Sequence, residues 1–219
     1  MTTRRTVAAL ALAAVLVTSG CVGFLTGGES LTFEAEPVQV SDSARQDAGY
    51  EQERRTTQTI NRTFTAAGQE RDVSVTNHLS EYSRSADTVL SDQQVARMIV
   101  LSTPQVKVAG QGPFNPVGEL SNRELVSRVT QKYDSIQNVR FESNRTLTML
   151  GEETTVSKFR ADATLQGGQE VEVFLHITKI QHEGDFVVAV AVHPTQIDEQ
   201  ERVDTLFRGV DHPAPAPES

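Results

Sequence analysis

The sequence predicts an α+β domain: an antiparallel β-sheet, made of an N-terminal hairpin and a four-stranded C-terminal meander, with two main helices packed on it. Three observations predict this class. Apolar and polar residues alternate at period two through most of the chain after residue 30, which is typical of half-buried strands. Glycine-containing acidic turns separate the strands of the second half. Two segments instead carry capping signals and apolar residues at helical spacing.

The first half of the domain predicts strands. Residues 32–40 begin as a strand, and segments 51–65 and 72–83 flank an Ala-Ala-Gly-Gln-Glu turn, so they are expected to form a hairpin. A further apolar run at 98–101 continues past Pro104 as an extended segment.

The second half predicts the meander. Alternation places Phe141 and Leu147 on one face of its first strand, and Phe159 and Ala161 on one face of the second. Short turns join these segments, which favours antiparallel neighbours. The strands are expected at 139–149, 154–165, 170–181 and 186–193.

Two helices are expected beside this meander. The first begins at Ser121, which forms a capping box with Glu124, and runs to about Tyr133. The second follows Pro194, with Thr195 as its N-cap. Its buried stripe is expected to consist of Val203, Leu206, Phe207 and Val210.

The N-terminus has the order of an export signal. Arg4 and Arg5 form a positive region, and the apolar run 7–17 that follows is too short for a membrane span. Residues 1–20 are therefore expected to be a signal peptide. The paired arginines resemble a twin-arginine signal, which exports folded proteins, although the general secretory route stays open.

Cys21, the only cysteine, follows Ser19 and Gly20 in an arrangement that resembles a lipobox. We expect the chain to be cut before Cys21 and lipidated there, with residues 21–30 as a short tether. The alternative is that Cys21 is an ordinary thiol. A single cysteine also leaves no intramolecular disulfide, so burial alone must hold the fold.

Composition limits the domain and its partners. Residues 31–211 are long enough for a single domain with a substantial core, and residues 212–219, rich in proline, are expected to form a disordered tail. The formal net charge of −9 argues against nucleic acid as a partner. Abundant acids, few lysines and no tryptophan are typical of a halophilic protein, and a merely acidic secreted protein is the alternative.

The stretches Ser-Thr-Pro-Gln-Val-Lys-Val-Ala-Gly-Gln-Gly-Pro-Phe-Asn-Pro-Val-Gly at 102–118 and Asp185 to Pro194, together with the signal, resemble an uncharacterised lipoprotein family of halophilic archaea. This resemblance implies no established activity. The expected order of hairpin, helix, meander and helix is similar to PsbP-like domains, which is a likeness of architecture only.

The candidate chemistry is sparse. His176, His182 and His193 fall on or beside neighbouring strands with Glu172 and Glu183 nearby, but no metal-binding spacing supports them, so we expect surface histidines and no metal or cofactor. No Gly-x-Ser-x-Gly elbow or phosphate-cradling loop is present. The sequence therefore predicts that the protein is not an enzyme, and the enzyme alternative would require His176, His193 and carboxylates within hydrogen-bonding reach.

One loop and two sequons remain. Gly110, Phe114 and Asn115 belong to a stiff, proline-containing loop that either lines a ligand groove or, in the preferred interpretation, forms a rigid connection whose Phe114 fills the core. Asn61 and Asn144 stand in Asn-x-Thr sequons and are candidate glycosylation sites.

The leading hypothesis is a non-enzymatic lipoprotein, anchored at the extracellular face of the cell membrane by its lipid, with a binding or structural role in the envelope. Other envelope proteins are its candidate partners. The alternative is a ligand- or metal-binding accessory protein of a transporter or redox complex. That alternative requires a concave pocket under the loop that ends at residue 118.

Overall fold

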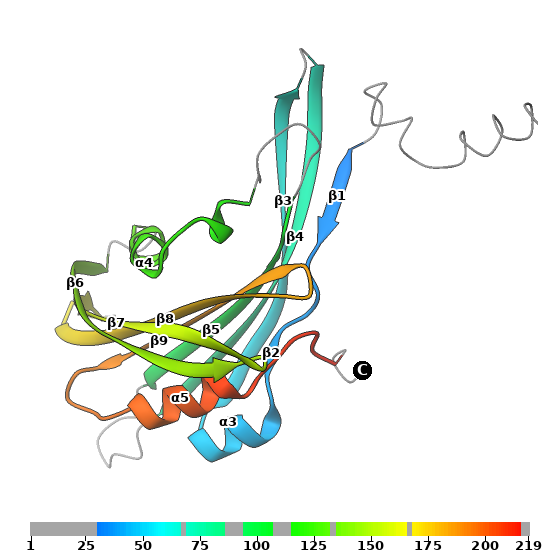
Figure 1. Cartoon of the computed structure of the whole chain (residues 1–219). Helices are drawn as coiled ribbons and strands as arrows, with labels where there is room; N and C mark the ends of the chain where they lie inside the picture. Colours follow the sequence, from blue (N-terminus) through cyan, green and yellow to red (C-terminus); the bar gives the residue numbers. More distant parts are fainter. Residues whose placement is uncertain are drawn as a thin grey trace, which may run out of the picture. The chain divides into compact units, whose positions relative to one another are not determined.

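The expected α+β class is wrong, because the computed structural model is mostly β, with 61% of its residues in strands and only three short α-helices among the described residues. The meander is one half of a larger sheet (Figure 1). The structure describes residues 30–66, 69–85, 94–106, 115–131, 135–165 and 168–215.

Ten strands and three α-helices make up the described chain. The strands are β1 (Leu31–Glu34), β2 (Gln39–Val40), β3 (Glu51–Ala66), β4 (Gln69–Ser85), β5 (Gln94–Pro104), β6 (Ile136–Met149), β7 (Glu152–Thr164), β8 (Glu170–His182), β9 (Asp185–Pro194) and β10 (Val210–Asp211). The helices are α3 (Asp42–Ala48), α4 (Asn122–Thr130) and α5 (Gln200–Arg208), with the 3-10 turn η1 (Pro116–Gly118) before α4. None of these helices is long and apolar enough to cross a membrane.

Contacts divide the chain into two units, each described by itself. The smaller unit contains residues 30–33 and the outer parts of β3 and β4, residues 60–66 and 69–75, where Thr63 donates a hydrogen bond of 2.7 Å to Asp72. The larger unit contains residues 34–59 and all described residues from 76 onward. The cores and the candidate site below belong to the larger unit.

The strands form an eight-stranded sheet in the order β1-β4-β5-β9-β8-β7-β6, with β3 also paired to β4, and β10 pairs with β2 in a separate ribbon. Each ladder from β4 through β5, β9, β8 and β7 to β6 is antiparallel. The four strands of the meander lie where alternation and turn signals predicted them. Sequence analysis missed that β9 also pairs with β5, because this pairing joins residues that are far apart in the chain.

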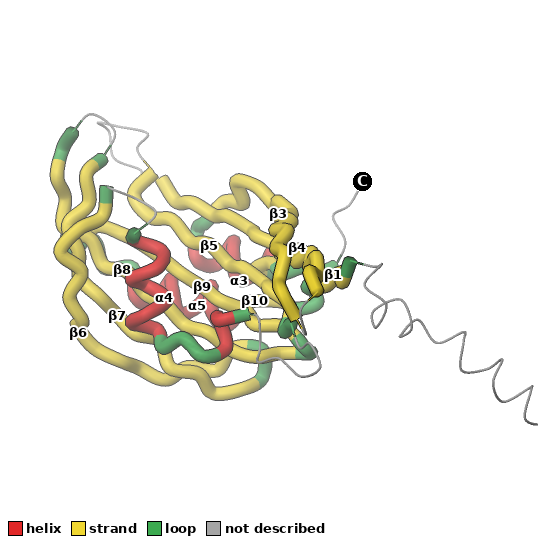
Figure 2. Tube along the Cα trace, turned by 90° about the horizontal axis from the view of Figure 1, so that it is seen from above, coloured by secondary structure: helices red, strands yellow, loops and turns green. Residues whose placement is uncertain are grey.

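The sheet of the larger unit has two unlike faces. On the α3/α5 face, side chains of α3 and α5 pack with β5, β6, β7 and β9, and Val100, Val187, Leu206 and Phe207 are fully buried there. On the α4 face, Leu125 and Val126 of α4 pack on Phe159, Leu175 and Ile177. Figures 1 and 2 show α3 and α5 beside one another on one side of the sheet and α4 on the other.

The predicted face of Phe141 is wrong, and a β-bulge is the reason. Leu147 lies in the α3/α5 core, whereas Phe141 packs edge-on against Phe159 on the α4 face. The register of β6 shifts between Phe141 and Ser143, and an extra residue reverses the alternation beyond it.

The two predicted helices differ in how well their ends were located. Ser121 caps α4 and forms the complete capping box with Glu124. The predicted cap Thr195 is wrong, because α5 begins at Gln200 after Glu199, whose side chain makes no capping bond. That carboxylate instead binds Arg84, with Nη2 2.5 Å from Oε1.

The N-terminal segment also departs from the prediction of one strand over 32–40. It splits into β1 and β2, because Pro37 has no N–H to donate and the N–H of Glu36 donates to the carboxylate of Asp185 at 2.7 Å. The helix α3 was not predicted, although Ser41 caps it and Gly49 ends it with a left-handed φ of 68°.

The C-terminal residues 212–215, expected to belong to a loose tail, instead pack on the domain. His212 is buried and its Nε2 lies 3.0 Å from the carboxylate of Asp185. The N–H of Ala214 donates to the carbonyl of Pro37 at 2.7 Å.

Candidate functional site

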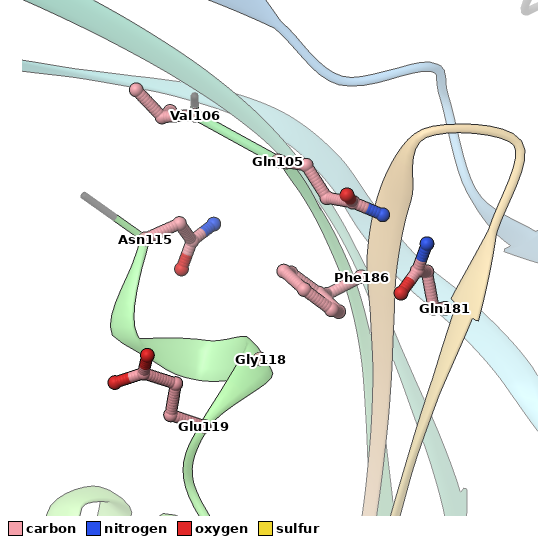
Figure 3. A pocket seen from close by; sticks show the side chains of 7 residues that line it. All are labelled: Gln105, Val106, Asn115, Gly118, Glu119, Gln181 and Phe186. Carbon is pink, nitrogen blue, oxygen red and sulfur yellow. The ribbon is translucent and has the colours of Figure 1, made fainter. Parts of the chain in front are cut away.

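A cavity of about 310 Å³ opens on the α4 face at the end of β5, beside the β8–β9 turn. Its walls come from three places: the end of β5, the segment that leads into α4, and the two strands of the β8–β9 hairpin. The lining residues are Gln105, Val106, Asn115, Gly118, Glu119, Gln181 and Phe186 (Figure 3). The volume is at the lower end of the range for small-molecule sites.

Strand register builds the floor of this cavity. Gln181 of β8 lies opposite Phe186 of β9, and Phe186 lies opposite Thr103 of β5. Directly opposite residues of antiparallel strands share a face, so all three side chains project from the α4 face. Figure 3 shows the ring of Phe186 pointing toward the segment that carries Asn115 and Gly118.

Asn115 fixes the wall segment to β5. Its Nδ2 donates to Thr103 Oγ1 at 2.9 Å and to the carbonyl of Pro104 at 2.7 Å, while its Oδ1 accepts from the N–H of Val117 at 3.0 Å. The amide is buried and its hydrogen-bonding groups are occupied, so Asn115 shapes the wall instead of offering free groups to a ligand.

Lys179 fixes the same segment to β8. Its ammonium donates to the carbonyls of Val117, Gly118 and Leu120 at 2.9, 2.8 and 2.8 Å. These three bonds use all three of its protons. Burial lowers the pKa of Lys179 below the usual lysine value, and the nearby Glu124 carboxylate opposes that change.

Gly118 allows the wall to approach the floor. A Cβ at this position would lie 2.4 Å from Cζ of Phe186, which is closer than carbon atoms approach in proteins. The absence of a side chain at residue 118 therefore lets the backbone of η1 lie directly on the aromatic ring.

Amide groups dominate the chemistry of the cavity. Gln181 and Glu119 are exposed side chains, and the walls also hold a buried Nε2 of Gln105 that has no hydrogen-bond partner among the described residues. No cationic side chain occurs among the described residues that line the cavity. Such a lining offers a ligand hydrogen bonds with amides and an apolar contact with a phenyl ring.

The structure describes one of the three predicted loop residues. Asn115 does line the cavity, whereas Gly110 and Phe114 lie outside the described residues. Sequence reasoning missed Gln105, Lys179 and other residues of the site, because glutamines and a lysine in strand patterns carry no local signal of a shared wall. Alternation along β8 puts Gln181 and the buried Ile180 on opposite faces, and this signal could have indicated that Gln181 lies on the α4 face.

The expectation of surface histidines is wrong for two of the three candidates. His176 and His193 are buried on the α3/α5 face, with their Nε2 atoms 3.0 Å apart, and His182 pairs instead with His212. Within the described ranges, no three histidine, cysteine or acidic side chains are grouped so that they could hold a metal ion. Glu172, predicted on the same face as His176, binds Arg160 at 2.6 Å.

The remaining predicted residues are not among the described residues that line the cavity. Arg4, Arg5 and Cys21 are outside the described residues. Asn61 and Asn144 are exposed strand residues, as a glycosylation acceptor requires, so both sequons stay predictions.

Two comparisons with known proteins bear on identity. No curated protein matches this chain in sequence. The model of one family, described as a domain of unknown function (DUF6517), matches residues 37–211, which include every described residue of the cavity and both sheet faces of the larger unit. The chain therefore belongs to the DUF6517 family.

Proposed function

We propose that this protein is an exported lipoprotein, anchored by Cys21 at the outer face of the cell membrane, and that its domain binds a small neutral ligand in the amide-lined cavity. The cavity on the α4 face is the observation that carries the binding function. Binding without catalysis is the simpler role, because the lining offers amides, one phenyl ring and a single exposed carboxylate.

The N-terminal sequence supports the location. Two arginines, an apolar run and a small-residue approach to Cys21 have the order of a lipoprotein signal. The net charge of −9 with few lysines supports a halophilic source, as does the resemblance of residues 102–118 to haloarchaeal lipoproteins.

The way the cavity is held supports a preformed site. Asn115 and Lys179 together make six hydrogen bonds that fix the segment 115–120 to β5, to β8 and to itself. A wall fixed in this way loses little conformational freedom when a ligand binds, and this favours affinity. The second candidate function, a solute-binding accessory of a transporter, uses the same cavity and differs in its partner.

The location is tested by comparing the native protein with Cys21→Ser in a high-salt host. We expect only the wild type to begin at residue 21 with added lipid mass and to stay in the membrane fraction. Equal solubility of both forms, with residues 1–20 retained, would contradict the anchor.

Ligand binding is tested by thermal denaturation of the domain with neutral sugars, nucleosides and dipeptide amides. A ligand of the cavity should raise the Tm of the wild type by mass action. The increase should be lost in Gln181→Ala and kept in Gln169→Ala, which removes an equally exposed glutamine outside the cavity. An increase that survives Gln181→Ala would place the ligand elsewhere.

A further inference from the structure

A chain of hydrogen bonds crosses the α3/α5 face from β9 to α5. Nδ1 of His193 lies 2.9 Å from the carbonyl of Pro194, Nε2 of His193 lies 3.0 Å from Nε2 of His176, and Nδ1 of His176 lies 3.0 Å from Nη1 of Arg145. Arg145 continues the chain through an ion pair with Asp204 of α5.

The partners at the two ends determine where each proton lies. A carbonyl only accepts, so Nδ1 of His193 carries a proton and its Nε2 carries a lone pair. A guanidinium only donates, so Nδ1 of His176 is the acceptor and its Nε2 carries the proton. The proton of His176 therefore fills the gap between the two rings, and both histidines are neutral.

The ring geometry agrees with this assignment. The two ring planes are inclined by only 19°, and their centroids are 5.2 Å apart. With the Nε2 atoms 3.0 Å apart, the rings meet edge to edge in nearly one plane, which aligns the N–H of His176 with the lone pair of His193. Since Nε2 of His176 is protonated, this pair has no free site there for a metal ion.

Neither histidine can take up another proton without losing a hydrogen bond of this chain. On Nε2 of His193 it would face the N–H of His176, and on Nδ1 of His176 it would face the guanidinium of Arg145. Burial, followed by the positive charge of Arg145, lowers the pKa of His176 to about 2, and burial lowers the pKa of His193 as well.

The charged groups around the pair come from three elements. Arg145 on β6 and Lys158 on β7 oppose a positive charge on the histidines. Asp198 and Glu199, just before α5, favour it at His193. Burial outweighs these two carboxylates, so the pKa of His193 is still lowered.

We propose that Arg145, His176 and His193 form an acid-sensitive latch that holds α5 on the sheet and releases it when the histidine pair is protonated. The latch acts through the bond from Arg145 to Asp204, because a charged His176 repels the guanidinium that holds that helix. Opening exposes the pair to water, where each histidine titrates near its ordinary pKa of about 6.5.

The sign of the pH dependence follows from the lowered pKa values. Above about pH 6.5 the closed and open states are equally unprotonated at this pair, so the latch keeps its full stability. Below that pH only the open state gains protons. Opening of the latch therefore becomes up to tenfold more favourable for each histidine with every pH unit of acidification.

The second histidine pair provides an internal control. Nδ1 of His182 lies 3.0 Å from Nδ1 of His212, and Nε2 of His212 lies 3.0 Å from the carboxylate of Asp185. This chain ends at a carboxylate, which only accepts, so its hydrogen bonds run from His182 through His212 to Asp185, and no guanidinium takes part in it.

The test is amide hydrogen exchange of the full domain, measured by mass spectrometry at pH 7.0, 6.0 and 5.0 with times corrected for the intrinsic rate. We expect protection of α5 to fall more than tenfold further than protection of α4 between pH 7.0 and 5.0. The excess should disappear in His176→Gln/His193→Gln and persist in the control His182→Gln.

Equal loss of protection in α4 and α5 of the wild type would overturn the latch, and this comparison needs no variant. An excess that persists in the folded double variant would also overturn it, because the pH dependence would then come from other groups. Loss of the excess in His182→Gln alone would assign the device to the other histidine pair and contradict the proposal.

Discussion

The two faces of the sheet differ in how completely their apolar residues are buried. On the α3/α5 face a single half-buried apolar residue, Leu150, packs against the core formed by the described residues, whereas Val190, Val192 and six others are only half-buried beside the core of the α4 face. Polar groups of the α3/α5 face are tied into buried networks, while the α4 face contains the cavity. Burial of apolar residues is therefore more complete on the α3/α5 face, and the α4 face has room for the ligand proposed above.

The largest difference in stability between the faces is expected when a charged side chain loses its partner. Arg84→Met leaves the carboxylate of Glu199, which is 2% exposed, with only the more distant guanidinium of Arg202 at 3.8 Å, and this should lower the free energy of unfolding by about 3 kcal/mol. Arg54→Met removes an exposed partner of Glu81 and should cost less than about 1 kcal/mol. Urea unfolding of both variants measures this, and equal losses would contradict the distinction.

Truncation of an apolar side chain should give a smaller difference in stability between the two cores. Leu206→Ala removes a fully buried side chain of α5 and should lower the free energy of unfolding by about 2–5 kcal/mol. Leu120→Ala removes a half-buried side chain beside the α4 core and should cost about 1–2 kcal/mol, since less area returns to water. A larger loss for Leu120→Ala in the same unfolding assay would show that the α4 face is as completely buried as the α3/α5 face.

Substitution of two glycines by alanine tests how rigid each face is. Gly209→Ala places a Cβ 2.1 Å from Cβ of Ala44 on α3, which cannot move without its helix, so its cost should reach about 3 kcal/mol. Gly118→Ala meets the ring of Phe186, which can turn toward the cavity, so about 1 kcal/mol is expected. Adding Phe186→Ala should relieve Gly118→Ala, and thermal unfolding of the double variant measures that relief.

The smallest effect on stability is expected inside the cavity. Gln181 is exposed and belongs to neither core, so Gln181→Ala should change the free energy of unfolding by less than about 0.5 kcal/mol. A loss of more than 1 kcal/mol in urea unfolding would indicate that this wall residue is structural.

Local signals were the part of the fold that the sequence could predict. The capping box of Ser121 and Glu124 and the alternation of β6–β9 depend on residues close in the chain, and both are present. The sequence could not reveal the bulge after Phe141, since an inserted residue reverses alternation without any change in composition.

The candidate site could be predicted even less, because its parts meet only in the folded sheet. Asn115 was a candidate as a loop residue, but its partner Thr103 and the clamp from Lys179 are tertiary contacts. His176 and His193 were wrongly expected at the surface, again because their partners are tertiary contacts. Polar residues in strands are usually exposed, and only Arg145 and Pro194 explain how this pair is accommodated.

Backbone amide shifts of the ¹⁵N-labelled domain test whether the α4 face binds the ligand proposed above. The domain is titrated with the neutral sugars, nucleosides and dipeptide amides named above. We expect saturable shifts at residues that line the cavity: Gln105, Val106, Gly118, Glu119, Gln181 and Phe186. Saturable shifts confined to α3 and α5, or none with any of the three ligand classes, would contradict it.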